Sequence, residues 1–72
     1  MATFADGTLL VSDYNHGRLV LFNGDGRFIG VIGRAGTGPG EFLQPWGVAI
    51  DDAGLMYVSE FRGSRIQILR RV

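Results

Sequence analysis

The middle of the 72-residue chain reads Gly36-Thr37-Gly38-Pro39-Gly40-Glu41-Phe42-Leu43-Gln44-Pro45-Trp46-Gly47-Val48-Ala49-Ile50-Asp51. Five of its first ten residues are glycine or proline, and the apolar run 46–50 follows directly. Glycine costs about 1 kcal/mol inside a helix and proline about 3 kcal/mol. The segment therefore predicts a tight connection that leads into a β-strand.

Glycine also interrupts the chain on both sides of this segment. The chain has 12 glycines, and its longest stretches without glycine or proline, 8–16 and 64–72, are shorter than a typical helix of about 11 residues. Short apolar runs lie between turn signals at 23–26 and 51–54. The fold is therefore predicted to be all-β. Its six short strands are predicted at residues 8–12, 18–22, 28–32, 46–50, 55–59 and 65–69.

Several of these runs are apolar at consecutive positions. A strand with one face in water alternates apolar and polar residues, but 18–22 and 28–32 do not. We therefore expect both faces of the sheet to be covered. A blade of a β-propeller, which lies between two similar blades, has this property.

The chain also repeats itself when it is shifted by 47 residues. Val11 then falls on Val58, and the shared pattern is V-S-[DE]-[YF]-x-x-x-R-[LI]-x-[LI]-[FL]. A period in the forties fits one four-stranded blade per repeat. Asp13 and Arg18 align with Glu60 and Arg65, so each acid is expected to bond turn amides or to pair with the arginine across its hairpin.

These residues resemble a known family. Residues 36–51 look like the linker and first strand of an NHL repeat, and 56–60 with 65–69 are similar to its second and third strands. The resemblance implies that 1–72 form one partial NHL-type propeller module with antiparallel blades. With the four strands of a blade labelled A to D from the central axis outward, strands B, C and D of one blade would lie in 1–33. The interblade linker would lie in 34–45, and strands A, B and C of the next blade in 46–72. The structural positions of the repeat are then Asp13, Arg18, Pro45, Gly47, Glu60 and Arg65.

The sequence departs from the usual repeat in two turns. Glu60 stands where the family usually has Asp, while Gly63 and His16 stand where it usually has Asn. These changes affect the expected turn contacts and leave the expected fold unchanged.

The resemblance implies a non-catalytic interaction scaffold that binds a protein or RNA partner through its blade loops. RNA is included as a candidate partner because some NHL propellers bind it on one face. The candidate contacts are Phe61, Arg62, Arg70 and Arg71, because arginine beside an aromatic ring can stack on single-stranded bases. One alternative is a truncated or engineered propeller fragment that self-assembles. Another is a piece of a propeller enzyme such as an amidating lyase.

Other chemistries have weaker support. Ser12, Asp13 and His16 have the residue types of a hydrolytic triad, but all three lie at one strand end. The glycines of 36–40 could cradle a phosphate, yet no lysine and no following helix accompany them. Asp25, Asp51 and Asp52 lack the spacing of a calcium loop. We expect no catalytic, cofactor or metal site and no small-molecule substrate.

Charge and length set further expectations. Seven arginines balance seven acids, and the sequence contains neither a signal peptide nor a membrane-spanning run, so we expect no membrane partner and a default cytoplasmic location. A chain this short has a small core, and the edges at 8–12 and 65–69 are expected to be unpaired, which favours self-association. Four copies of six strands make the 24 strands of six four-stranded blades.

Overall fold

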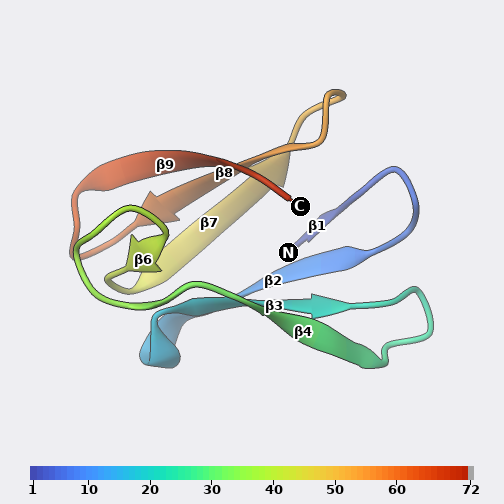
Figure 1. The fold of residues 1–72 in the computed structure, drawn as a ribbon, viewed down its shortest axis with the longest axis horizontal. Helices are drawn as coiled ribbons and strands as arrows, with labels where there is room; N and C mark the ends of the chain where they lie inside the picture. The colour runs from blue at the N-terminus through green and yellow to red at the C-terminus, as the bar shows by residue number, and fades with distance from the viewer. Residues whose placement is uncertain (72) are drawn as a thin grey trace.

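The computed structural model describes residues 1–71 and confirms the predicted all-β fold (Figure 1). A short 3-10 helix, η1 (Tyr14–His16), interrupts the strands. Within the described residues, no helix has the length and apolar character needed to cross a membrane. The strands are β1 (Ala2–Thr3), β2 (Leu9–Asp13), β3 (Arg18–Phe22), β4 (Phe28–Ile32), β5 (Arg34–Ala35), β6 (Glu41–Phe42), β7 (Pro45–Ile50), β8 (Leu55–Glu60) and β9 (Arg65–Arg70).

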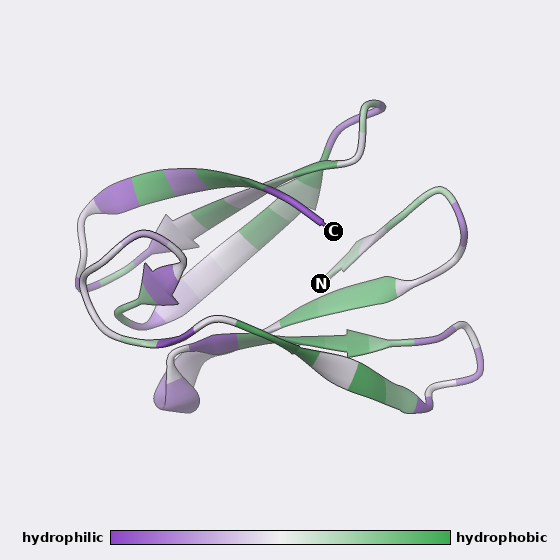
Figure 2. Ribbon diagram, viewed as in Figure 1, coloured by the Kyte–Doolittle hydropathy of each residue, from purple (hydrophilic) through white to green (hydrophobic). Residues whose placement is uncertain are grey.

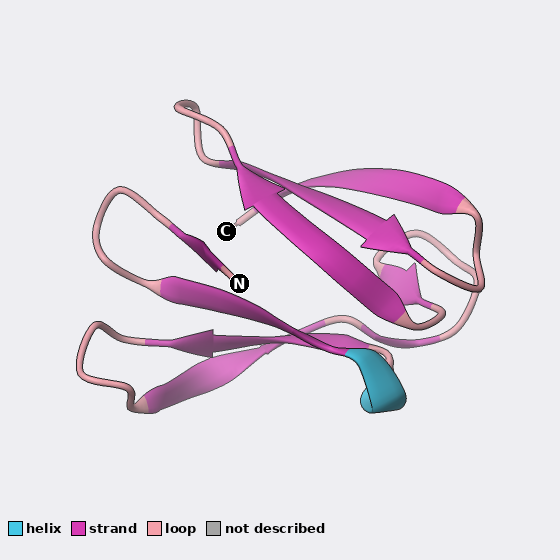
Figure 3. Cartoon of the chain, turned by 180° about the vertical axis from the view of Figure 1, so that it is seen from behind, coloured by secondary structure: helices cyan, strands magenta, loops and turns pink. Residues whose placement is uncertain are grey.

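Most of the strands form two antiparallel sheets. The first sheet has the order β1-β2-β3-β4 and the second has the order β7-β8-β9. Figures 1 and 3 show them as two layers, with the segment that carries β6 at one end. All six predicted strands are present, each within one residue at either end.

The sequence prediction missed β1. This strand pairs with Leu9 and Leu10 of β2, and a tight turn closed by a 2.8 Å hydrogen bond from the Phe4 amide to the Thr8 carbonyl connects the two strands. The first sheet therefore has four strands where residues 1–33 were predicted to form three. The edge at 8–12, predicted to be unpaired, is partly covered. A strand of two residues is too short to show the alternation by which strands are recognised.

The predicted linker at 34–45 is more ordered than its composition suggests. β5 and β6 form a short parallel ladder in which Arg34 pairs with Glu41 and Ala35 with Phe42. The Phe42 side chain is fully buried and belongs to the core. The linker thus contributes to the packing between the sheets as well as connecting them.

Two glycines allow this segment to approach the first sheet closely. Gly17 has φ 65°, and a Cβ there would lie 2.6 Å from the Ala35 Cα. Gly33 has φ 79°, and a Cβ there would lie 2.5 Å from the Phe42 ring. Both positions combine a left-handed backbone with no room for a side chain, so only glycine fits.

The core lies between the two sheets. Figure 2 shows apolar residues along the strands of both layers. Along β8, burial alternates, so Met56 and Val58 face the first sheet and are fully buried. Burying one such side chain contributes about 1.5–3 kcal/mol. The buried cluster consists of Phe4, Leu10, Leu19, Phe42, Met56 and Val58, with Leu21, Ile32, Val48, Ile50 and Leu69 packed against it.

Each sheet leaves its other face open. Phe28 and Val31 on the first sheet, and Ile66 and Ile68 on the second, are between 47% and 68% exposed. Within the described residues, the predicted cover is therefore present on one face of each sheet only, because two sheets can cover only one face of each other.

Candidate partner-binding surface

Three aromatic side chains from three segments meet at one end of the molecule. Tyr14 comes from η1, Trp46 from the start of β7, and Phe61 from the turn after β8. The Tyr14 ring lies edge to face with Trp46, with centroids 5.5 Å apart, and its centroid is 6.4 Å from that of Phe61. Trp46 and Phe61 are each 70% exposed. We call these three side chains the aromatic surface; Figure 3 shows the end where η1 lies beside the start of β7.

Hydrogen bonds hold the backbone beneath the aromatic surface. The Ser12 hydroxyl donates to the Trp46 carbonyl at 2.9 Å, which ties β7 to the first sheet. The Phe61 amide donates to the Gln44 carbonyl at 2.9 Å, which ties the turn after β8 to the linker. The aromatic side chains are therefore carried on a fixed scaffold.

Pro45 and Gly47, predicted as structural positions of the repeat, flank Trp46. Pro45 is fully buried and pairs with Glu60, and the register with β8 is irregular just beyond it. The Gly47 amide donates to the Ser59 hydroxyl at 2.9 Å, and a Cβ on Gly47 would lie 2.8 Å from that oxygen. A larger residue at position 47 would force the Ser59 hydroxyl to move and would break this hydrogen bond beside Trp46.

Both predicted ion pairs form. In the first sheet the Arg18 Nε donates to Asp13 Oδ2 at 2.9 Å, and Asp13 Oδ1 contacts His16 Nδ1 at 2.8 Å. The hydrogen bond with His16 and then that with Arg18 lower the pKa of Asp13. This pair is half-exposed and stabilises the turn that carries Tyr14.

The equivalent pair in the second sheet holds the linker, and its carboxylate is buried: the Glu60 side chain is fully buried, while that of Arg65 is 35% exposed. Glu60 is 4% exposed and accepts hydrogen bonds from Arg65, from the Leu43 amide at 2.8 Å and from the Gln67 side chain at 3.0 Å. Burial acts to raise the pKa of Glu60, but these hydrogen bonds outweigh it and the pKa is lowered. Arg65 also donates to the carbonyls of Thr37 (3.0 Å), Gly38 (3.3 Å) and Glu41 (2.8 Å).

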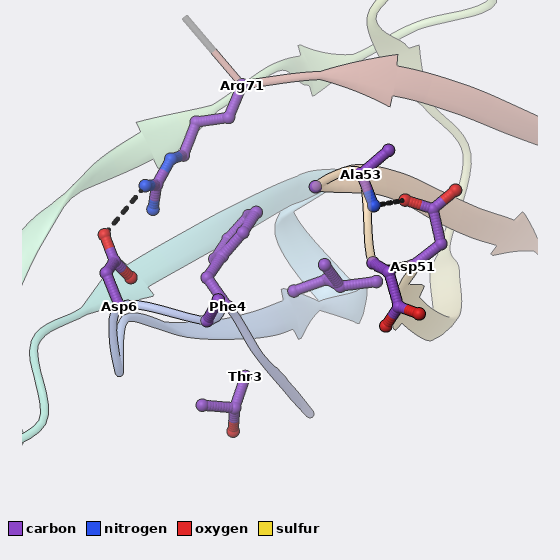
Figure 4. Close-up of a pocket in the computed structure, with 10 residues that line it drawn as sticks. Thr3, Phe4, Asp6, Asp51, Ala53 and Arg71 are labelled. Atoms are coloured by element: carbon purple, nitrogen blue, oxygen red, sulfur yellow. Dashed lines mark hydrogen bonds and ion pairs between the residues drawn. The ribbon is translucent and has the colours of Figure 1, made fainter.

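The structure does not bring the predicted arginine contacts together. Arg62 is exposed and lies next to Phe61, in the turn before β9. Arg70 is exposed at the far end of β9. Arg71 is engaged within the chain, since it pairs with Asp6 at 2.9 Å and lies 4.1 Å over the Phe4 ring (Figure 4).

A cleft of about 470 Å³ lies beside this Arg71 contact, between the turn after β1 and the turn after β7 (Figure 4). Two of its carboxylates, Asp6 and Asp51, already make hydrogen bonds within the chain. Asp51 accepts hydrogen bonds from the Ala53 and Leu55 amides at 3.0 and 2.9 Å and from the Tyr57 hydroxyl at 2.8 Å. The bond from Tyr57 is the main reason that the pKa of Asp51 is lowered.

A family model described as a 6-bladed β-propeller matches residues 2–67. The chain belongs to this family of six-bladed β-propellers. It is also 41% identical over 37 residues to protein lin-41 of Caenorhabditis elegans, a match that covers 51% of this chain and 3% of that protein. The predicted propeller resemblance is confirmed, and the two antiparallel sheets are not closed into a ring; we call them the first and the second blade.

The other candidate chemistries can be placed on the two blades. The Ser12 hydroxyl bonds the Trp46 carbonyl, while His16 contacts Asp13. The glycine loop of the linker wraps around the Glu41 carboxylate, which accepts a hydrogen bond from the Gly38 amide at 3.1 Å. Among residues 1–71, no group of three or more histidines and carboxylates is arranged to hold a metal ion.

Sequence reasoning found Phe61 but not Tyr14 or Trp46. Tyr14 could have been found, because it aligns with Phe61 in the 47-residue repeat. Trp46 has no counterpart in the aligned part of the repeat, so only the structure brings it to the other two rings.

Proposed function

We propose that this propeller segment is a non-catalytic scaffold that binds a protein partner through the aromatic surface. The observation that carries the proposal is that Trp46 and Phe61 are both 70% exposed and both contact or lie beside Tyr14. Large aromatic residues are enriched in the centres of protein interfaces and supply much of their binding energy.

The fixed backbone adds a second argument. Binding loses free energy when side chains and loops must be ordered. Here the Ser12 and Phe61 hydrogen bonds hold the aromatic surface in place before any partner arrives. Tyrosine, tryptophan and phenylalanine also have few rotatable bonds, so a partner gains contact area at a small entropic cost.

The exposed charge beside the aromatic surface favours a partner that carries negative charge. Arg62 is exposed next to Phe61, and no ion pair holds it among the described residues. We therefore expect a peptide segment with apolar or aromatic side chains and at least one carboxylate that reaches Arg62. A single-stranded RNA is the second candidate, because bases stack on aromatic rings and Arg62 can contact a phosphate.

The experiment uses the single tryptophan of the chain, which lies in the aromatic surface, so its fluorescence reports directly on occupancy. Peptides are selected from a displayed random library against the wild-type chain, and a random single-stranded RNA pool is titrated in parallel. Selected peptides are expected to shift the Trp46 emission. Phe61→Ala is expected to weaken their binding by about 30-fold, which corresponds to about 2 kcal/mol.

Phe28→Ala is the matched control, since Phe28 is 63% exposed but lies on β4, in another part of the molecule. It should leave peptide affinity unchanged. Peptides that leave the Trp46 emission unchanged and bind the Phe61→Ala variant normally would contradict the proposal. RNA binding that falls steeply with salt and weakens in Arg62→Ala would assign the surface to RNA instead.

A further inference from the structure

The open face of the second blade carries an exposed apolar surface. Tyr57 pairs with Ile68, and Ser59 with Ile66, so these four side chains lie on the same face of β8 and β9. Ile66 is 68% and Ile68 is 59% exposed. A groove of about 270 Å³ runs over this face, partly lined by Ala49, Tyr57, Ser59 and Ile66. We call Tyr57, Ser59, Ile66 and Ile68 the tail face.

The 47-residue repeat identifies the residues of the first blade that are equivalent to the tail face. Tyr57, Ser59, Ile66 and Ile68 correspond to Leu10, Ser12, Leu19 and Leu21 of the first blade. In the first blade Leu10 and Leu19 are fully buried and Leu21 packs against the core between the blades. Ser12 donates a hydrogen bond to the Trp46 carbonyl of the second blade. The tail face is therefore the repeat equivalent of a face that already binds a blade.

The open face of the first blade is the surface that could contact a tail face. Val11, Val20 and Val31 are neighbours across β2, β3 and β4; Val31 is 47% exposed, whereas Val20, on the inner strand, is 9% exposed. We call these three valines the head face. Val11 and Val20 correspond to Val58 and Gln67. These two residues lie on the side of the second blade that packs against the first blade and its linker.

We propose that the tail face of one copy binds the head face of a second copy. In such a contact, the second blade of one copy would pack on the first blade of the next copy through the same repeat positions by which the two blades pack within one chain. Such a contact is head-to-tail, so each copy keeps one free face for a further copy, and the series ends only if it closes into a ring. The zero net charge of the chain adds no long-range repulsion between copies.

Counting blades rather than strands changes the expected number of copies. The 72-residue segment forms two blades, so three copies of this segment contain the six blades that the family has. The count of four copies was based on six strands in each chain, whereas the first blade has four strands and the second has three. The aromatic surface lies at the end of the blades, so this association is independent of partner binding there.

The test uses two variants, each of which blocks one face. Ile66→Asp with Ile68→Asp blocks the tail face, and Val31→Asp blocks the head face. All three side chains are exposed, so the monomer should keep its β-sheet circular dichroism spectrum. By analytical ultracentrifugation, the wild-type chain is expected to approach the mass of three copies as concentration rises, and each variant alone is expected to remain a monomer.

An equal mixture of the two variants is the decisive sample. One variant retains an intact head face and the other an intact tail face, so the mixture should form a dimer and nothing larger. Phe61→Asp is the matched control and should associate like the wild type. If a blocked variant does not fold, Ile66→Thr with Ile68→Thr keeps strand-forming residues on the tail face and should weaken association at least tenfold. The proposal would be overturned if the wild-type chain stays monomeric, or if the blocked variants associate as the wild type does. A mixture of the two variants that stays monomeric would also overturn it.

Discussion

Glu60 and Arg65 occupy the same repeat positions as Asp13 and Arg18, yet the two pairs have different surroundings. Glu60 is buried and Arg65 holds three linker carbonyls, whereas the Asp13 and Arg18 side chains are 23% and 43% exposed. An exposed ion pair contributes about 1 kcal/mol or less, while removing one partner of a buried pair leaves an uncompensated charge.

The pairs should therefore respond differently to the same substitution. We expect Arg65→Ala to lower the free energy of unfolding by about 3 kcal/mol, the low end for a buried pair, because Arg65 is itself 35% exposed and because Leu43 and Gln67 still donate to Glu60. Arg18→Ala should cost about 1 kcal/mol or less. Urea unfolding followed by circular dichroism measures both, and equal losses would contradict this account.

The sequence identified these pairs because the repeat places each acid five positions before its arginine. It could not show that one pair is buried, since Asp13 and Glu60 differ by only one methylene group. Burial of Glu60 depends on the linker folding back over β8 and β9, which is a tertiary contact. The aromatic surface illustrates the same limit, because Trp46 reaches Tyr14 only through the packing of one blade on the other.

At the scale of single elements, the strands were predictable and the linker was not. The strands have runs of apolar residues between turn signals, and this pattern located six of them within one residue. β1, β5 and β6 are two residues long each, and their pairing depends on neighbours elsewhere in the chain. A glycine-rich sequence gives no local signal for such contacts.

The linker strand β6 should matter more for stability than its length suggests. Phe42→Ala would remove a fully buried ring from the core between the blades and should lower the free energy of unfolding by about 3–5 kcal/mol. Phe28→Ala removes the same atoms from a site that is 63% exposed and should have an effect of about 0.5 kcal/mol. Chemical denaturation at a concentration where the chain is monomeric compares them. Similar effects would mean that the linker contributes little to the core.

For the whole molecule, the carboxylates predict sensitivity to acid. The pKa values of Asp6, Asp13, Glu41, Asp51 and Glu60 are all lowered in the folded chain. The unfolded chain therefore binds more protons than the folded chain when the pH falls through the ordinary carboxyl range near about pH 4. The stabilisation that these ionised carboxylates provide is fully present above that range, and it is lost as the pH falls below it.

We therefore expect the urea midpoint to be nearly constant from about pH 7 to pH 5 and to fall progressively below about pH 4. Glu60→Gln should reduce this dependence, because it removes one carboxylate whose pKa is lowered. Circular dichroism at each pH provides the measurement. A midpoint that rises as the solution becomes acidic would show that these carboxylates do not stabilise the folded chain.

The hydrogen bonds of the linker have a consequence for the geometry of a ring. The amides of Gly36, Gly38, Gly40 and Leu43 each donate to an acceptor within the chain, two of them to side chains on β8 and β9. The connection is therefore held in one conformation against the second blade, and it also approaches the first blade closely at Gly17 and Gly33. In a closed ring of six blades, the number in the family, each step from blade to blade is a sixth of a full turn. The segment richest in glycine is thus the part of the chain that sets how the second blade is oriented relative to the first.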